Sequence, residues 1–163
     1  YKVRSYHIIK LDLQAISRSS MLTNRSLAVT NYSDKPLPQT ITNSYVPGRN
    51  LLLLTHAAAY AEANGISDIY FGANADDGQC YPDCRMDFFN SFNQICQSCS
   101  NTANIKVHVP FIAMSKRDVV IKSKLLHVDL QNTLSCYAPI ENKACGICLS
   151  CVQRISSIRA AKI

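Results

Sequence analysis

Four cysteines lie close together near the C-terminus, in the stretch "LSCYAPIENKACGICLSC" (134–151). They are Cys136, Cys145, Cys148 and Cys151, with the spacing C-x8-C-x2-C-x2-C. Structural zinc sites are usually built from short C-x2-C turns with further ligands nearby, and four thiolates complete the tetrahedral coordination of Zn²⁺. The spacing therefore predicts a zinc-binding motif at 136–151. Its role should be structural, because four protein ligands leave no coordination position for water.

The alternative interpretations of these cysteines are two disulfides or four free buried thiols. Disulfide frameworks are typical of small secreted chains. A chain of 163 residues suits one domain, 1–163, that can bury a core of its own. Gly146 allows a tight turn between Cys145 and Cys148, and Cys151 lies one helical turn beyond Cys148. These features favour the metal site.

The other four cysteines form no second cluster in the sequence. Cys96 and Cys99 have C-x2-C spacing but no second pair nearby, so we predict two free thiols at the end of a helix. The alternative for this pair is a second metal or redox site. A Cys–His nucleophile is a further alternative, and it would join residues distant in the sequence: Cys80 or Cys84 with His56 or His108.

Strands and helices alternate along the chain. Short apolar runs at 6–13, 67–73 and 104–112 predict buried strands. Helical patterns cover 48–64, 84–99 and 115–126. A last helix begins near residue 148, and its side chains expected to face inward are Leu149, Val152, Ile155 and Ile158. The first of these helices is apolar nearly all round and should be buried; Gly65 is its expected C-cap, and Ser115 the N-cap of the third. This order predicts an α/β fold with a mainly parallel sheet flanked by helices.

Residues 17–44, rich in Ser, Thr, Asn and Pro, predict a long loop. In parallel sheets, ligands bind beyond the carboxyl ends of the strands. Two stretches follow predicted strands in this way: "NADDGQCYPDCR" (74–85) and "PFIAMSK" (110–116). We therefore expect a ligand site at that edge of the sheet.

The composition excludes several classes of protein. The chain is 47% hydrophobic and 17% charged, which is typical of a folded domain and not of a disordered one. The net charge is +6, but no block of five or six like charges indicates a nucleic-acid-binding tail, so a solvated basic face is favoured. No apolar run reaches the roughly 18 residues of a membrane span, and the first residues lack a signal-peptide pattern. We therefore expect a cytoplasmic protein.

Five motifs occur in the same order as in the 7-cyano-7-deazaguanine synthase (QueC) family, which this chain resembles from about residue 45 to 161. They are "VPGRN" (46–50), "GANADDGQCYPDCR" (72–85), "VPFIAMSKRDVV" (109–120), "SCY" (135–137) and "ACGICLSC" (144–151). The resemblance implies an adenine-nucleotide hydrolase-like (HUP/PP-loop) fold. It also implies one structural Zn²⁺ per chain on the four cysteines, and a homodimer.

The same resemblance implies an ATP-dependent carbon–nitrogen ligase of queuosine biosynthesis, a pathway to a modified tRNA base. Such an enzyme converts 7-carboxy-7-deazaguanine and ammonia into 7-cyano-7-deazaguanine, with ATP and its Mg²⁺ as co-substrate. The carboxylate is activated as an acyl adenylate, ammonia gives the amide, and a second activation dehydrates it to the nitrile. The partners are thus small molecules, with no direct contact to nucleic acid or membrane.

Activation of a carboxylate by ATP requires positive groups near the phosphates. We expect catalytic roles for Arg85, Asp83 and Lys116, and nucleotide binding by Arg49, Asn74 and Asp76. The arginines offer forked donors to carboxylate or phosphate, and Lys116 begins a helix whose free N–H groups favour anions. Asp83 is expected to bind the guanine-like edge or to orient Arg85. The alternatives are surface ion pairs for the arginines, a solvent-exposed lysine and a helix cap at Asp83.

The sequence departs from the family pattern in its phosphate loop; Cys80 and the pair Cys96 and Cys99 are also outside that pattern. The family's "SGGxDS" loop, which wraps the ATP pyrophosphate in backbone N–H groups, does not occur, and "SRSSM" (17–21) lacks glycine. We therefore expect these 163 residues alone to bind ATP poorly. Two alternative functions follow: another PP-loop ATP pyrophosphatase, such as a tRNA-modifying enzyme, or a zinc-stabilised scaffold without catalysis.

Overall fold

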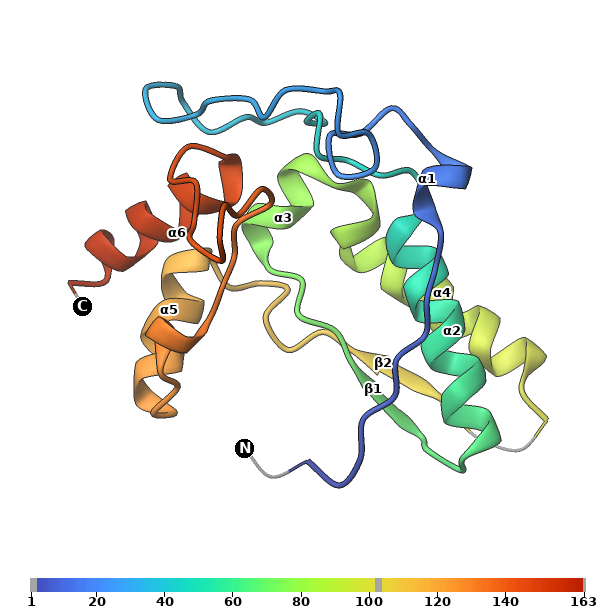
Figure 1. Cartoon of the computed structure of the whole chain (residues 1–163). Helices are drawn as coiled ribbons and strands as arrows, with labels where there is room; N and C mark the ends of the chain where they lie inside the picture. The colour runs from blue at the N-terminus through green and yellow to red at the C-terminus, as the bar shows by residue number, and fades with distance from the viewer. Residues whose placement is uncertain (1–2, 102–103, 163) are drawn as a thin grey trace.

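A computed structural model of the chain describes residues 3–101 and 104–162 (Figure 1). Within these residues the sheet has two parallel strands, β1 (Asp68–Tyr70) and β2 (Lys106–His108), in the register Ile69 opposite Val107. The prediction of an α/β fold with a parallel sheet is confirmed, but the sheet is smaller than expected. The two predicted strands at 67–73 and 104–112 are each shortened to three paired residues.

The predicted strand at 6–13 is wrong. This segment runs extended beside α2 (Arg49–Ala63) and has no ladder partner among the described residues. Its apolar side chains are exposed, Ile8 by 79% and Ile9 by 53%. Asp12 ends the segment by capping the short helix α1 (Leu13–Ile16). An apolar run in the sequence can form a β-strand only if a second strand lies beside it and accepts and donates its backbone hydrogen bonds.

The four predicted helices are confirmed. They are α2, α4 (Met86–Cys99), α5 (Lys116–Leu125) and α6 (Leu149–Ala160). Local signals explain their ends: Gly65 has a left-handed φ of 64° just after α2, and Ser115 caps α5 in a capping box with Asp118. Four short elements were not predicted: the helices α1 and α3 (Ala75–Cys80) and the 3₁₀ helices η1 (Pro82–Cys84) and η2 (Leu130–Asn132).

The core lies where α2 and α4 pack beside the two strands. Phe89, Phe92 and Cys96 form the buried face of α4, with Phe89 0% exposed. The prediction that α2 is buried all round is wrong, because Leu51 and Leu53 are each 43% exposed. In α6, packed beside α5, Leu149 is buried as predicted. Ile155 is 39% exposed, contrary to prediction.

The long loop predicted at 17–44 is confirmed, and it crosses over α3 toward the C-terminal segment (Figure 1). Its backbone reaches the cysteine motif, where the N–H of Tyr32 donates to the carbonyl of Ile147 at 2.9 Å. It also reaches α3, where the thiol of Cys80 donates to the carbonyl of Pro38 at 3.1 Å. The loop therefore connects the C-terminal motif to the segment that follows β1. Among the described residues, no helix combines the length and apolarity that a membrane crossing requires.

Candidate functional site

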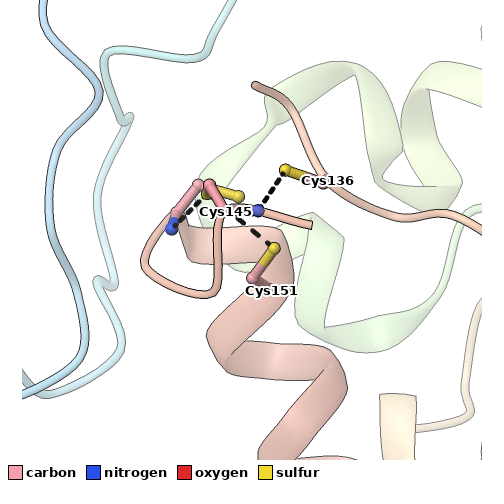
Figure 2. Close-up of side chains that lie close together, drawn as sticks. Cys136, Cys145 and Cys151 are labelled. Atoms are coloured by element: carbon pink, nitrogen blue, oxygen red, sulfur yellow. Dashed lines mark hydrogen bonds between the residues drawn. The ribbon is translucent and has the colours of Figure 1, made fainter. Parts of the chain in front are cut away.

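The four C-terminal cysteines converge. The sulfur atoms of Cys136, Cys145, Cys148 and Cys151 all lie within 4.8 Å of one another. Figure 2 shows three of these side chains, Cys136, Cys145 and Cys151, with their sulfur atoms pointing toward a common centre. In a tetrahedral Zn–S₄ site with bonds of about 2.3 Å, the sulfurs lie about 3.8 Å apart. The four thiols therefore fit a metal ion, as the spacing predicted.

The alternative of disulfides is wrong. All eight cysteines are free, and the sulfurs of Cys145 and Cys151 lie 4.0 Å apart. A disulfide requires about 2.05 Å. Convergence without covalent bonds is the geometry of a ligand set.

Two turns bring the thiols together. Ile140 and Lys143 pair across a tight turn at Glu141 and Asn142, both with left-handed φ, and this returns the chain from Cys136 to Cys145. Gly146 then adopts a φ of 78°, which carries the chain into Cys148, the N-cap of α6. Backbone N–H groups point at the sulfurs: that of Cys145 donates to the sulfur of Cys136 at 3.3 Å.

The thiols differ in acidity. Burial raises the pKa of Cys148, and it raises the pKa of Cys151 to about 12. For Cys145 burial also acts to raise the pKa, but hydrogen bonds from the backbone of Cys148 and Ile147 outweigh it and bring the pKa to about 7. Metal ligands must be deprotonated. A divalent cation supplies the positive charge that four clustered thiolates require.

A cavity of about 550 Å³ lies beyond the carboxyl ends of β1 and β2, at the edge where a ligand site was predicted. Three segments line this cavity: those that follow β1, η1 and β2. Their lining residues include Asn74, Ala75, Arg85, Met86, Ile112 and Ala113. Of the predicted site residues, Asn74 and Arg85 line this cavity. The Nε of Arg85 donates to the carbonyl of Gly78 at 2.9 Å, which holds the guanidinium at the rim.

Asn74 and Asp76 also hold the sheet edge together. The side chain of Asn74 caps α3, accepting from the N–H groups of Asp76 and Asp77. The carboxylate of Asp76 accepts from the backbone N–H of Lys116 at 2.8 Å. We expected the free N–H groups at the N-terminus of α5 to attract an external anion. One of them, that of Lys116, instead donates to the carboxylate of Asp76 in the same chain.

Asp83 connects the "VPGRN" and "YPDCR" motifs. It is 8% exposed, and its Oδ2 accepts from the N–H of Asn50, in the first turn of α2, at 3.3 Å. Its Oδ1 is buried with no hydrogen-bond partner among the described residues. The side chain of Asn50 donates in return to the carbonyl of Asp83 and accepts from the Nε of Arg49. The two motifs, more than 30 residues apart in sequence, thereby form one structural unit.

Asp77 is a site residue that the sequence reasoning missed. It is half-buried, and burial raises its pKa although Lys116, the backbone of Asn74 and Arg49 act to lower it. The positive charges of Arg49 and Lys116 therefore both act on the carboxyl group of Asp77. The spacing from Asn74 to Asp77 is that of a capping box, which is the signal in the sequence that would have identified it.

The raised pKa of Asp77 predicts a pH dependence of stability. A carboxyl with a higher pKa in the folded state binds its proton more tightly there. The free energy of unfolding should therefore fall as pH rises from the ordinary aspartate pKa of about 3.9 through the raised value. Asp77→Asn should remove this part of the pH dependence, measured by urea unfolding at a series of pH values. Asp118→Asn is the control: the Ser115 hydroxyl lowers the pKa of Asp118, so its loss should change the slope in the opposite direction.

The structure gives no support to a Cys–His nucleophile: among the described residues the thiol of Cys80 donates to the carbonyl of Pro38, and the sulfur of Cys84 accepts from the side chain of Asn50. Burial raises the pKa of Cys84 to about 12, which opposes formation of a reactive thiolate. The two histidines have other partners: the carbonyl of Leu52 for His56 and, at 2.7 Å, Asp68 for His108. Cys96 and Cys99 are free thiols at the end of α4, as predicted.

Comparison with known proteins agrees with this geometry. The family model described as "Queuosine biosynthesis protein QueC" matches residues 1–162. A 7-cyano-7-deazaguanine synthase of Rickettsia bellii is 36% identical over 161 residues, covering 98% of this chain and 71% of the relative. That of Rickettsia felis is 37% identical over 162 residues, covering 98% and 72%, and that of Rickettsia akari 34% over 169 residues, covering 100% and 74%. With the four converging thiols and a cavity at the sheet edge, these matches show that the chain belongs to the QueC family of queuosine biosynthesis proteins.

Proposed function

We propose that the chain acts as a 7-cyano-7-deazaguanine synthase, an ATP-dependent carbon–nitrogen ligase of queuosine biosynthesis. The observation that carries this proposal is the family match over residues 1–162, together with relatives of that name that align with nearly the whole chain. These relatives favour the synthase over another PP-loop pyrophosphatase and over a scaffold without catalysis. The substrates are 7-carboxy-7-deazaguanine, ammonia and ATP with its Mg²⁺.

We assign the cavity at the sheet edge to the reacting carboxylate. In the first step a carboxylate oxygen attacks the α-phosphorus of ATP and pyrophosphate leaves, so negative charge must be stabilised on both sides of the new bond. The Nε of Arg85 donates to the carbonyl of Gly78. The terminal amino groups of the same guanidinium then bind the anionic ligand. Arg49 and Lys116, which both act on Asp77, supply positive potential for the phosphates.

The acidic and amide residues have different proposed roles. Asn74 and Asp76 shape the nucleotide side of the edge by fixing the starts of α3 and α5. Asp83 fixes the start of α2 through Asn50 and, by holding the turn before Arg85, orients that guanidinium. The buried carboxylate acts on the reaction through its neighbours.

We propose Zn²⁺ as the metal of the four thiols. Thiolate sulfur is a soft ligand, and a tetrahedral set of four selects zinc or an iron–sulfur cluster over magnesium or calcium. The site occupies a turn and the start of a helix, where a closed ion links the loop to α6. Zinc therefore stabilises structure here, while ATP supplies the chemical activation. By family resemblance we further propose a cytoplasmic homodimer, which light scattering can test.

The test of the proposed function is the rate of ATP-dependent nitrile formation by the natural, full-length protein. Arg85→Ala should lower kcat/KM by about 10²- to 10³-fold, because a charge-stabilising donor is lost, and Arg85→Lys should restore part of it. Arg117→Ala is the matched control: the Nε of Arg117 also donates to a backbone carbonyl, that of Ala160, but on α5 away from the cavity. Its rate should change by less than about twofold, as for an exposed surface residue.

Two results would contradict the proposal. One is an active enzyme whose Arg85→Ala and Arg117→Ala variants have the same kcat/KM, which would mean that the reaction does not take place in the cavity. The other is a folded, metal-loaded protein that forms no adenylate or nitrile, which would favour the scaffold.

A further inference from the structure

Three side chains, those of Thr42, Ser44 and Tyr81, form a buried hydroxyl cluster. The hydroxyl of Tyr81 hydrogen-bonds to that of Ser44 at 2.7 Å and lies 3.3 Å from that of Thr42. The hydroxyls of Thr42 and Ser44 lie 2.8 Å apart, and all three residues are buried. Three contacts match three hydroxyl protons, so each hydroxyl can donate once and accept once. Because the loss of one hydroxyl would leave its buried partners unsatisfied, the three side chains hold one another in place.

The hydroxyl cluster joins the end of the loop at 17–44 to the turn that follows α3. Two neighbouring contacts support this junction. The thiol of Cys80 donates to the carbonyl of Pro38 at 3.1 Å, and the ring of Tyr45 stacks on that of Tyr81 with the centroids 6.4 Å apart. The loop, which crosses over α3 (Figure 1), is therefore fixed to the residue from which the "YPDCR" motif begins.

The same two segments meet again a few residues further along the chain. After the loop, the chain continues through "VPGRN" into α2, where the backbone and side-chain N–H groups of Asn50 donate to Asp83, each at 3.3 Å. Segments 42–50 and 81–85 are thus connected at two points, the hydroxyl cluster and the pair of Asn50 and Asp83. Two points of contact fix the orientation of one segment relative to the other, whereas a single point would leave rotation free. Arg85, the last residue of the second segment, lines the cavity.

We infer that Tyr81 is a positioning residue: its hydroxyl, held by its two partners in the hydroxyl cluster, fixes the turn that carries Arg85 to the cavity. The backbone continues this path, because the N–H of Cys84 donates to the carbonyl of Tyr81 at 3.0 Å and that of Arg85 to the carbonyl of Pro82 at 3.3 Å. Tyr81 is not among the residues that line the cavity, so it acts through Arg85. The catalytic consequence rests on the proposed function, but the ordering of the turn can be measured without substrate.

The first test is amide hydrogen exchange at Cys84 and Arg85 in the natural, full-length protein. Tyr81→Phe removes one hydroxyl of the cluster and should raise exchange at both amides by about three- to tenfold, the factor expected from one lost hydrogen bond. Ser44→Ala should give a similar increase. The double variant should exceed neither single variant by more than about twofold, because both substitutions remove the same hydrogen bond.

The second test is the rate of nitrile formation. Tyr81→Phe should lower kcat by about three- to tenfold and change the KM values by less than about twofold, because a misplaced Arg85 costs more in the charged transition state than in substrate binding. In an Arg85→Ala background, Tyr81→Phe should lower kcat no further, because the residue through which it acts is absent. A purely structural role would cause the same loss in both backgrounds.

Tyr70→Phe is the matched control. It makes the same chemical change on β1, where the side chain is 72% exposed and stacks on His108. It should leave kcat and the exchange of the two amides unchanged. Within each variant, the amide of Val119 on α5 is a second control. Its N–H donates to the carbonyl of Ser115 at 3.0 Å, away from the hydroxyl cluster, and its exchange should stay as in the wild type.

Unchanged exchange at Cys84 and Arg85 in Tyr81→Phe would overturn the inference. An equal rise at Val119 would do the same, because it would mean a general loss of stability. Should Tyr81→Phe fail to fold, Ser44→Ala decides by the same measurements. An active enzyme with the same kcat in the wild type and in Tyr81→Phe would overturn the inference and leave the proposed function intact. The expected exchange in a protein without synthase activity would overturn the proposed function and leave the ordering of the turn by Tyr81 intact.

Discussion

Cys151→Ser should abolish stoichiometric zinc binding and lower the free energy of unfolding by about 3–5 kcal/mol. The reason is linkage: a ligand that binds only the folded state stabilises it by about 4 kcal/mol when present at a thousand times its Kd. Loss of one of four thiolates opens the tetrahedral site and removes most of this contribution. Metal analysis of the purified protein and urea unfolding with and without a chelator measure the two effects.

Cys99→Ser is the control for this substitution. It makes the same change at an exposed cysteine at the end of α4, outside the four-thiol cluster. It should retain one zinc per chain and unfold within about 0.5 kcal/mol of the wild type. A Cys151→Ser protein with full zinc content, or a wild-type protein whose stability does not respond to chelation, would refute the structural role of the metal.

Phe89→Ala should destabilise the protein by about 3–5 kcal/mol, the usual cost of a large cavity in a core. Phe89 is 0% exposed, and its ring packs on those of Phe71 and Phe88 with centroids 5.3 and 5.2 Å away. Phe71 follows β1 directly, so this contact holds α4 against the strand that leads into the cavity. Urea or thermal unfolding measures the loss.

Ile95→Ala tests whether burial is the cause. Ile95 lies on the same helix but is 54% exposed, so its truncation should cost less than about 1 kcal/mol. Equal losses for the two variants would show that α4 does not pack through the Phe89 face.

Much of the molecule follows from short-range patterns in the sequence. The capping box of Ser115 and Asp118, and Gly65 after α2, involve residues within one turn of each other, so local spacing suffices to locate the helices. The four-thiol cluster is of the same kind. Cys145, Cys148 and Cys151 lie on one turn and the start of one helix, and their spacing alone brings the sulfurs together.

Other features depended on which segments meet in space. The apolar run at 6–13 has the composition of a strand, yet it has no strand partner within the described residues. The exposure of Leu51 and Leu53 depends on which sides of α2 other elements cover. Strand pairing and side-chain burial cannot be predicted from one segment alone, because each depends also on the segment that packs against it.

The candidate active site shows the same division. Its location beyond the strands, and Asn74 and Arg85 at the cavity, were predicted from the sequence order of strands and loops. The sequence by itself thus determined the helices, the thiol cluster and the edge of the sheet where chemistry is expected, since each depends on neighbours along the chain. Only the tertiary structure decided that Asp76 accepts from the N–H of Lys116 and that the hydroxyl of Ser44 meets that of Tyr81, because these hydrogen bonds join residues 40 and 37 positions apart.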